Sequence, residues 1–139
     1  MNLRSSNANH HSLRPHQTGH VAGRKSGTHV RFEIEWMIDT GADIGVVRKI
    51  VGDNFDLVAT AASASPTNGG GGILIKQGLQ VEFTAEDSVG IPRAMRSALP
   101  VGVKSSNAGS DIIGMDQLAT LNVEVNWSPN SRVGTLKKI

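Results

Sequence analysis

The chain has 139 residues, which is enough for one compact domain with a modest core. It contains no Cys, and this excludes disulfides, thiolate zinc sites and a Cys nucleophile. Its 14 basic and 12 acidic residues leave a formal net charge of +2, a balance that argues against nucleic acid as a partner.

The apolar residues lie in short runs. No run approaches the roughly 18 residues of a membrane-spanning helix, and the N-terminus lacks the apolar region of a signal peptide. We therefore expect no membrane segment and a cytoplasmic location. Sixteen Gly, three Phe and two Trp favour turns, short strands and a mostly aliphatic core.

Residues 1–27 are predicted to form a disordered or loosely attached N-terminal extension. They are rich in Asn, Ser, His, Arg and Gly and offer almost nothing apolar to bury. Metal binding is an alternative, because four of the five histidines lie here and His16 and His20 are four residues apart. Gly19 weakens a helix at this point and no acidic residue joins the cluster, so we predict a solvated tail and no metal.

Alternation of apolar and polar residues begins at His29. Val30, Phe32 and Ile34 alternate with charged residues, which predicts a half-buried strand that continues to Ile38. The stretch from Pro66 to Gly72 is the strongest turn signal in the chain, and the apolar segments around it predict a mobile β-hairpin with a glycine-rich tip. Other expected elements here are a strand with a short helical turn over 44–51 and strands over 57–60 and 79–83.

The last third of the chain is predicted to contain three strands and one helix. The helix covers 115–121, and Asp116 is expected to cap it near its start. The strands cover 94–103, 122–127 and 132–137. The chain therefore predicts a mainly β fold with one short C-terminal helix, in a single domain over residues 28–139.

The predicted strand that ends at Ile38 stops abruptly at Asp39-Thr40-Gly41-Ala42-Asp43. A carboxylate at the end of an apolar strand is costly unless it is hydrogen-bonded or shares a proton, and active sites often contain such groups. Asp39-Thr40-Gly41-Ala42 resembles the active-site motif of aspartic proteases, in particular the short retroviral-type (retropepsin-like) members that supply one Asp per chain.

Two further features stand in the order that the retropepsin-like family requires. The glycine-rich hairpin at 68–76 takes the place of the family's flap. Ile112-Ile113-Gly114 is similar to the family's hydrophobic-hydrophobic-Gly motif, which threads beside the active-site strand and opens the C-terminal helix. The resemblance covers nearly the whole predicted domain and implies a closed, β-barrel-like acid protease half.

The resemblance implies an aspartic endopeptidase that needs no metal or cofactor. Two carboxylates about 3 Å apart share one proton, so that one can deprotonate a water while the other protonates the carbonyl oxygen of the peptide. Because the chain has a single Asp-Thr-Gly, the second Asp39 must come from another copy. This predicts a homodimer with a two-fold axis through the site.

Roles for the neighbouring residues also follow from the resemblance. Thr40 holds the two active-site loops together across the axis, and Gly41 lets the substrate backbone approach closely. The substrate is a peptide or protein that binds extended, as an added β-strand. The residues expected to contact it are Ala42, Asp43, Ile44, Gly70, Gly71, Ile73 and Ile112. Ordinary turn chemistry for Asp43 and ordinary core packing for the isoleucines are the competing interpretations.

Three alternatives stand beside the peptidase. The family's hairpin before the active-site strand is not evident here, so the first strand lies around Gln17 to Ala22 or is missing. If it is missing, a catalytically silent retropepsin-like dimerisation or peptide-binding domain is expected. In a further alternative, Asp-Thr-Gly is accidental in a small β scaffold. A phosphate-binding loop at 69–72 is disfavoured, because neither a Gly-Lys-Ser/Thr ending nor a helix follows.

Overall fold

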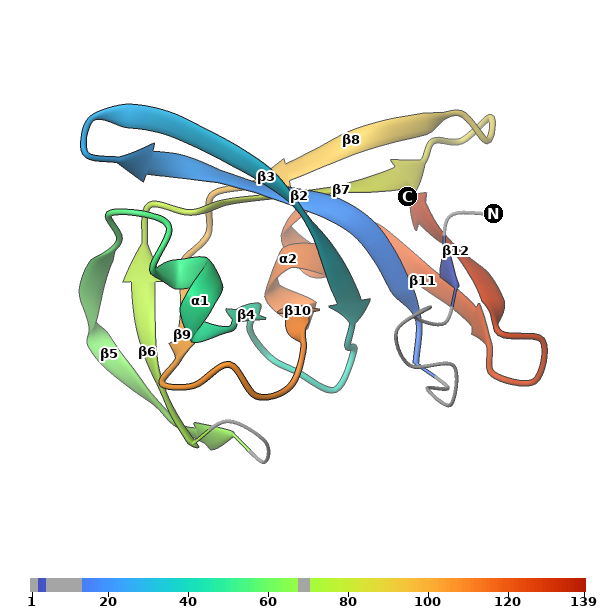
Figure 1. The fold of residues 1–139 in the computed structure, drawn as a ribbon. Helices are drawn as coiled ribbons and strands as arrows, with labels where there is room; N and C mark the ends of the chain where they lie inside the picture. Colours follow the sequence, from blue (N-terminus) through green and yellow to red (C-terminus); the bar gives the residue numbers. More distant parts are fainter. Residues whose placement is uncertain (1–2, 5–13, 68–70) are drawn as a thin grey trace.

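The computed structural model describes residues 3–4, 14–67 and 71–139 and is built mainly of β-strands (Figure 1). The strands are β1 (Leu3–Arg4), β2 (His16–Lys25), β3 (Thr28–Ile38), β4 (Val46–Val47), β5 (Val58–Thr67), β6 (Gly71–Gln77), β7 (Gln80–Glu86), β8 (Pro92–Ser97), β9 (Val101–Lys104), β10 (Asp111–Ile113), β11 (Val123–Ser128) and β12 (Val133–Lys138). The helices are α1 (Lys49–Gly52) and α2 (Met115–Thr120). The mainly β prediction is confirmed. The described residues hold two short helices: α2 is the expected C-terminal helix, and α1 lies at the end of the segment 44–51, where a short helical turn was expected.

The prediction of a disordered extension over residues 1–27 is wrong for residues 16–25, which form β2. This strand pairs antiparallel with β3 along its whole length, from His16 opposite Met37 to Lys25 opposite Thr28. A first strand around Gln17 to Ala22 was the alternative expectation, and the structure agrees with it. Residues 5–13 of the expected extension lie outside the described residues.

Several residues of β2 are buried, although few residues of this strand are apolar. Val21 is fully buried, and the Gln17 side chain is bonded to the Thr84 backbone through both its amide N–H and its oxygen. Gly19 lies under the Trp36 indole, where a Cβ would stand 2.5 Å from Cδ1. The strand therefore uses a glycine to make room for a large aromatic side chain, and that glycine weakens the apolar pattern in the sequence.

One path of hydrogen-bonded strands runs through the molecule in the order β5-β6-β9-β4-β10-β3-β2-β1-β12-β7-β8, with β11 beside β12 and an additional pairing of β2 with β7. Within this path β10 lies between β3 and β4. It is parallel to β3, with Ile113 opposite Ile38, and antiparallel to β4, with Ile112 opposite Val46. The two strands that flank residues 39–45 are therefore held apart by a segment about 70 residues later in the chain.

The core is mostly aliphatic, as the composition predicts, and surrounds Trp36 and Phe83. Trp36 is fully buried, and its indole N–H donates to the Glu82 carbonyl oxygen at 3.0 Å, which satisfies the one polar atom of the ring. Ile113 and Leu118 bring β10 and α2 into the same core. The end of β3 is thus packed into the same core as β10 and α2.

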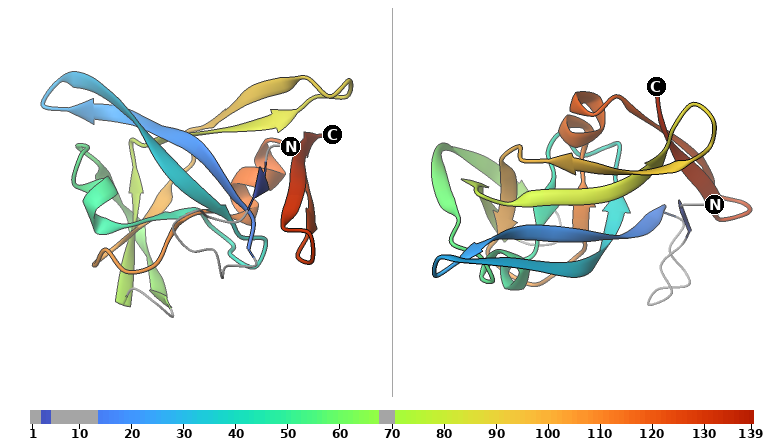
Figure 2. Two further views of the ribbon diagram at one scale, coloured as in Figure 1. Left: turned by 45° about the vertical axis from the view of Figure 1, so that its right-hand side comes forward. Right: turned by 90° about the horizontal axis from the view of Figure 1, so that it is seen from above.

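The expected hairpin is formed by β5 and β6, and β6 is anchored to β9 on its other side. Its tip at 68–70 lies outside the described residues. The single strand expected over 94–103 is divided into β8, which pairs with β7, and β9, which pairs with β6 and β4. Figures 1 and 2 show the end of β3 and the far end of the β5–β6 hairpin on the same side of the molecule.

Candidate functional site

The loop from Asp39 to Gly45 follows β3 and forms a compact turn. The Asp39 N–H donates to the Ile113 carbonyl at 3.0 Å, and the Ala42 N–H donates to the Asp39 carbonyl at 3.2 Å. The Gly41 N–H donates to Asp39 Oδ1 at 2.9 Å, so that one carboxylate oxygen is oriented by its own loop. The Asp39 side chain is 23% exposed, and Thr40, Gly41 and Asp43 are exposed. One face of the carboxylate is therefore open to solvent.

The corner between β10 and α2 packs directly on this loop. The Met115 N–H donates to the Ala42 carbonyl at 2.8 Å, and the Asp116 N–H donates to the Asp43 carbonyl at 3.1 Å. Gly114 lies at the point of closest approach, where a Cβ would stand 2.4 Å from the carbonyl carbon and oxygen of Ile44. The structure thus brings the Asp-Thr-Gly and Ile-Ile-Gly motifs into contact and requires glycine at position 114.

Asp116 ties the two segments together through its side chain. Its Oδ1 accepts the Gly45 N–H at 3.0 Å and the Gln117 N–H at 2.8 Å. Burial raises the pKa of the Asp116 carboxyl above its usual range, against the opposing effect of these two N–H groups. Gly114 occupies the N-cap of α2, and Asp116 lies in the first turn, where its carboxylate accepts the Gln117 N–H as expected of a cap near the helix start. The same oxygen also supports the loop through Gly45, which was not expected.

The described residues that were expected to contact substrate lie in three places: the Asp39 loop (Ala42, Asp43 and Ile44), β10 (Ile112) and the start of β6 (Gly71 and Ile73). Ile44 and Ile73 both lie close to Gly102, where an added Cβ would stand 3.4 Å and 3.0 Å from their Cδ1 atoms. Ile73 is buried, whereas Ile44 and Ile112 are half-buried. Gly71 begins β6, and Gly70 lies outside the described residues. Ile73 of β6 and Ile44 of the Asp39 loop therefore both approach β9 at Gly102.

A hollow of about 280 Å³ opens beside Asp39 and is lined by Arg14, Pro15, Ile38, Asp39, Thr40, Val125 and Trp127. Arg14 Nη1 stands 3.5 Å from Asp39 Oδ2, and its side chain is 64% exposed. The Pro15 carbonyl accepts the Ile38 N–H at 2.9 Å, which brings Arg14 to the end of β3. Sequence analysis missed this contact because Arg14 lies in the segment that was expected to be a solvated tail.

An ion pair fixes the other end of β10. Asp111 is 3% exposed, and its carboxylate accepts the Arg48 backbone N–H at 2.9 Å and the guanidinium Nε and Nη2 at 3.2 and 3.1 Å. Lys104 lies nearby and donates to the carbonyls of Ala108 and Ser110. Burial lowers the pKa of the Lys104 ammonium, although the charge of Asp111 opposes this shift. These contacts hold the loop that leads into β10.

The described residues hold no group of three or more His, Cys, Asp or Glu side chains placed to bind a metal. His16 and His20 lie on a strand rather than a helix, so their backbones are about 13 Å apart. Among the described helices, none has the length and apolar character to cross a bilayer.

Comparison of the sequence with models of known protein families gave no match, and comparison with curated proteins gave none either. The chemistry of the site therefore has to be judged from its own residues. Each chain offers one Asp-Thr-Gly carboxylate, Asp39, next to a hollow and on the same side as a hairpin, and Asp43 is exposed on the same loop.

Proposed function

We propose that the chain is an aspartic endopeptidase of retropepsin type that works as a homodimer. The observation that carries the proposal is the junction between the Asp39 loop and the β10–α2 corner. Backbone bonds from Met115 and Asp116 to Ala42 and Asp43, together with the Gly114 contact, fix the position of one acid per chain. A site that places two identical carboxylates about 3 Å apart across a two-fold axis needs each carboxylate to be held in a fixed position.

In the proposed dimer the two Asp39 carboxylates share one proton and flank a water. The ionised carboxylate takes a proton from the water as it attacks the peptide carbonyl, and the protonated one donates to the carbonyl oxygen. Gly41 orients Asp39 Oδ1 in each chain, which leaves Oδ2 for the second subunit and the water. Thr40 is exposed on the same loop and would face its counterpart across the axis.

The proposed substrate is an extended peptide or protein segment. Ile44, Ile73 and Ile112 supply apolar surface for its side chains. We also propose that the strands close as one acid protease half. Pairing of β2 with β3, β7 and β1 supports this arrangement.

A second candidate is a catalytically silent domain of the same type that dimerises or binds peptides. The contact between Arg14 and Asp39 favours it, because the guanidinium occupies the Oδ2 side that a shared proton would need. Arg14 is largely exposed, and its ion pair at 3.5 Å is loose, so the side chain can leave when a second subunit approaches. The peptidase therefore remains the first proposal.

The test compares the wild type, Asp39→Asn and Asp53→Asn on an unfolded protein such as casein, between about pH 4 and 7. Asp53 is exposed and pairs with Lys49 at the surface, so Asp53→Asn is a matched loss of one carboxylate away from the loop. We expect fragments from the wild type and Asp53→Asn and none from Asp39→Asn.

The pH dependence gives an independent check. A shared proton predicts a rate that falls once both carboxylates ionise, so a rate still rising through about pH 9 would argue against the pair. Absence of fragments from all three proteins, with a dimer in sedimentation, would support the silent domain. A monomer without activity would contradict the peptidase and the dimerising form of the silent domain, and would leave peptide binding alone.

A further inference from the structure

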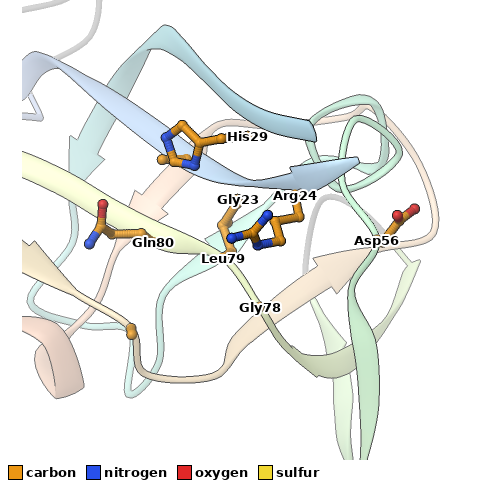
Figure 3. Close-up of a pocket in the computed structure, with 9 residues that line it drawn as sticks. Gly23, Arg24, His29, Asp56, Gly78, Leu79 and Gln80 are labelled. Atoms are coloured by element: carbon orange, nitrogen blue, oxygen red, sulfur yellow. The ribbon is translucent and has the colours of Figure 1, made fainter. Parts of the chain in front are cut away.

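A second hollow, of about 410 Å³, lies between the β2–β3 turn and the ends of the β5–β6 hairpin (Figure 3). Its floor is apolar or lacks side chains, with Ala22, Gly23, Leu79 and Ala98 contributing. The volume falls within the range of small-molecule sites, which are mostly apolar and contain a few placed polar groups.

This hollow is separate from the Asp39 site. Ala22 and Gly23 lie near the end of β2 that pairs with the start of β3, whereas Asp39 follows the opposite end of β3. Because β2 spans ten residues, the two sites are about 25–30 Å apart. A ligand in this hollow would therefore not occupy the proposed peptide site.

Arg24 is exposed at the border of the hollow and forms no ion pair with an acidic residue in the described part of the chain. Its guanidinium donates to the Gly27 carbonyl at 3.4 Å, which is a long bond to a neutral acceptor. Asp56 also borders the hollow, but its Oδ2 accepts the Ser26 N–H at 2.7 Å and its Oδ1 lies 3.6 Å from Lys25 Nζ. Figure 3 shows the Asp56 carboxylate pointing away from His29 and Gln80.

We infer that this hollow binds a small carboxylate that carries an apolar body. The planar guanidinium of Arg24 matches a carboxylate through two parallel N–H bonds, and Gln80 and His29 border the same space with further donors. The apolar body lies against Leu79, Ala22 and Ala98. A phosphate is a poorer fit, because it carries more charge than one Arg balances.

The backbone beside the hollow is closely packed at Gly23. An added Cβ on Gly23 would stand 2.7 Å from the Phe55 ring and 2.9 Å from the Gly78 carbonyl. Gly78 has a φ of +112° and directly follows β6. Backbone amides at these positions should therefore report binding sensitively.

The test uses 4-phenylbutyrate as the probe and its neutral amide, 4-phenylbutyramide, as the matched ligand control. Amide chemical shifts of the ¹⁵N-labelled full chain are followed during titration to about 10 mM of each. We expect saturable shifts at Gly23, Gly78, Leu79 and Ala98 with the acid, and about tenfold weaker binding of the amide.

Two variants test whether Arg24 is the residue that binds the carboxylate of the probe. Arg24→Gln should weaken the acid about tenfold and leave the amide unchanged, so that both probes bind this variant alike. Arg93→Gln removes an exposed Arg that pairs with Asp87 outside the hollow, and it should bind both probes as the wild type does. The inference would be overturned if the wild type bound both probes with equal affinity, or if Arg93→Gln weakened the acid as much as Arg24→Gln does. It would also be overturned if the shifts appeared at other residues, or if no shifts appeared by about 10 mM. Binding is read without activity, so the outcome is independent of the proposed peptidase.

Discussion

Gly114→Ala tests how tightly the β10–α2 corner holds the Asp39 loop. The added Cβ would stand 2.4 Å from the Ile44 carbonyl carbon and oxygen, and normal contact needs about 3.4 Å or more. The backbone must therefore move by about 1 Å, which strains the core and weakens the two bonds from Met115 and Asp116 to the loop. Overpacking together with loss of these bonds gives a destabilisation of about 3 kcal/mol.

The measurement is urea unfolding of wild type, Gly114→Ala and Gly72→Ala at one protein concentration. Gly72 is the matched control, because a Cβ there meets nothing within 4 Å and the residue is exposed. We expect Gly72→Ala to change the free energy of unfolding by less than about 0.5 kcal/mol. The reasoning is refuted if Gly114→Ala is as stable as Gly72→Ala. The backbone at the Asp39 loop would then accommodate a Cβ at position 114 without loss of stability.

Three further substitutions address buried polar groups around the loop. Asp116→Asn keeps an oxygen for both N–H bonds and removes the buried charge. Because the folded-state pKa of Asp116 is raised, wild-type stability is lost as the pH rises from about 4 through that pKa. The melting temperature of Asp116→Asn should equal that of the wild type near pH 3 and exceed it at pH 7. Gln117→Met should raise the free energy of unfolding by about 1–2 kcal/mol in urea titrations, because neither side-chain amide atom has a hydrogen-bond partner among the described residues. Arg48→Met leaves the Asp111 carboxylate buried without its guanidinium and should cost about 3 kcal/mol, whereas Lys49→Met, in an exposed pair, should cost less than about 0.5 kcal/mol.

Sequence analysis locates a strand most directly where the strand's own residues carry a period-two pattern. In β3, buried Ile34 and Trp36 alternate with exposed charged residues, and this local pattern is enough to define the strand. In β2 the inward positions include Gly19 and Gln17, whose burial depends on Trp36 and on the Thr84 backbone. Because those partners are distant in sequence, a local pattern could not identify this strand.

In the candidate site, too, contiguous motifs were predicted and contacts between distant residues were not. Asp39-Thr40-Gly41 and Ile112-Ile113-Gly114 were found because each motif is contiguous, and the structure brings them together. Asp116 was assigned to a helix cap from its neighbours, but its bond to Gly45 joins residues 71 apart in the chain. The contact of Arg14 with Asp39 likewise depends on the pairing of Pro15 with Ile38. Long-range polar contacts of this kind have no signal in a single sequence.

The central claim is that two copies of Asp39 form one site, and a mixing experiment tests it most directly. Wild-type chains at fixed concentration are exchanged with increasing Asp39→Asn chains, and cleavage of casein is measured at about pH 5. If each site needs an Asp39 from both subunits, equal amounts of the two proteins should lower the rate to about half, because half of the wild-type chains then sit in mixed dimers. With Asp53→Asn in place of Asp39→Asn, mixed dimers keep both acids and the rate should not fall. A rate unchanged by excess Asp39→Asn would contradict the shared site.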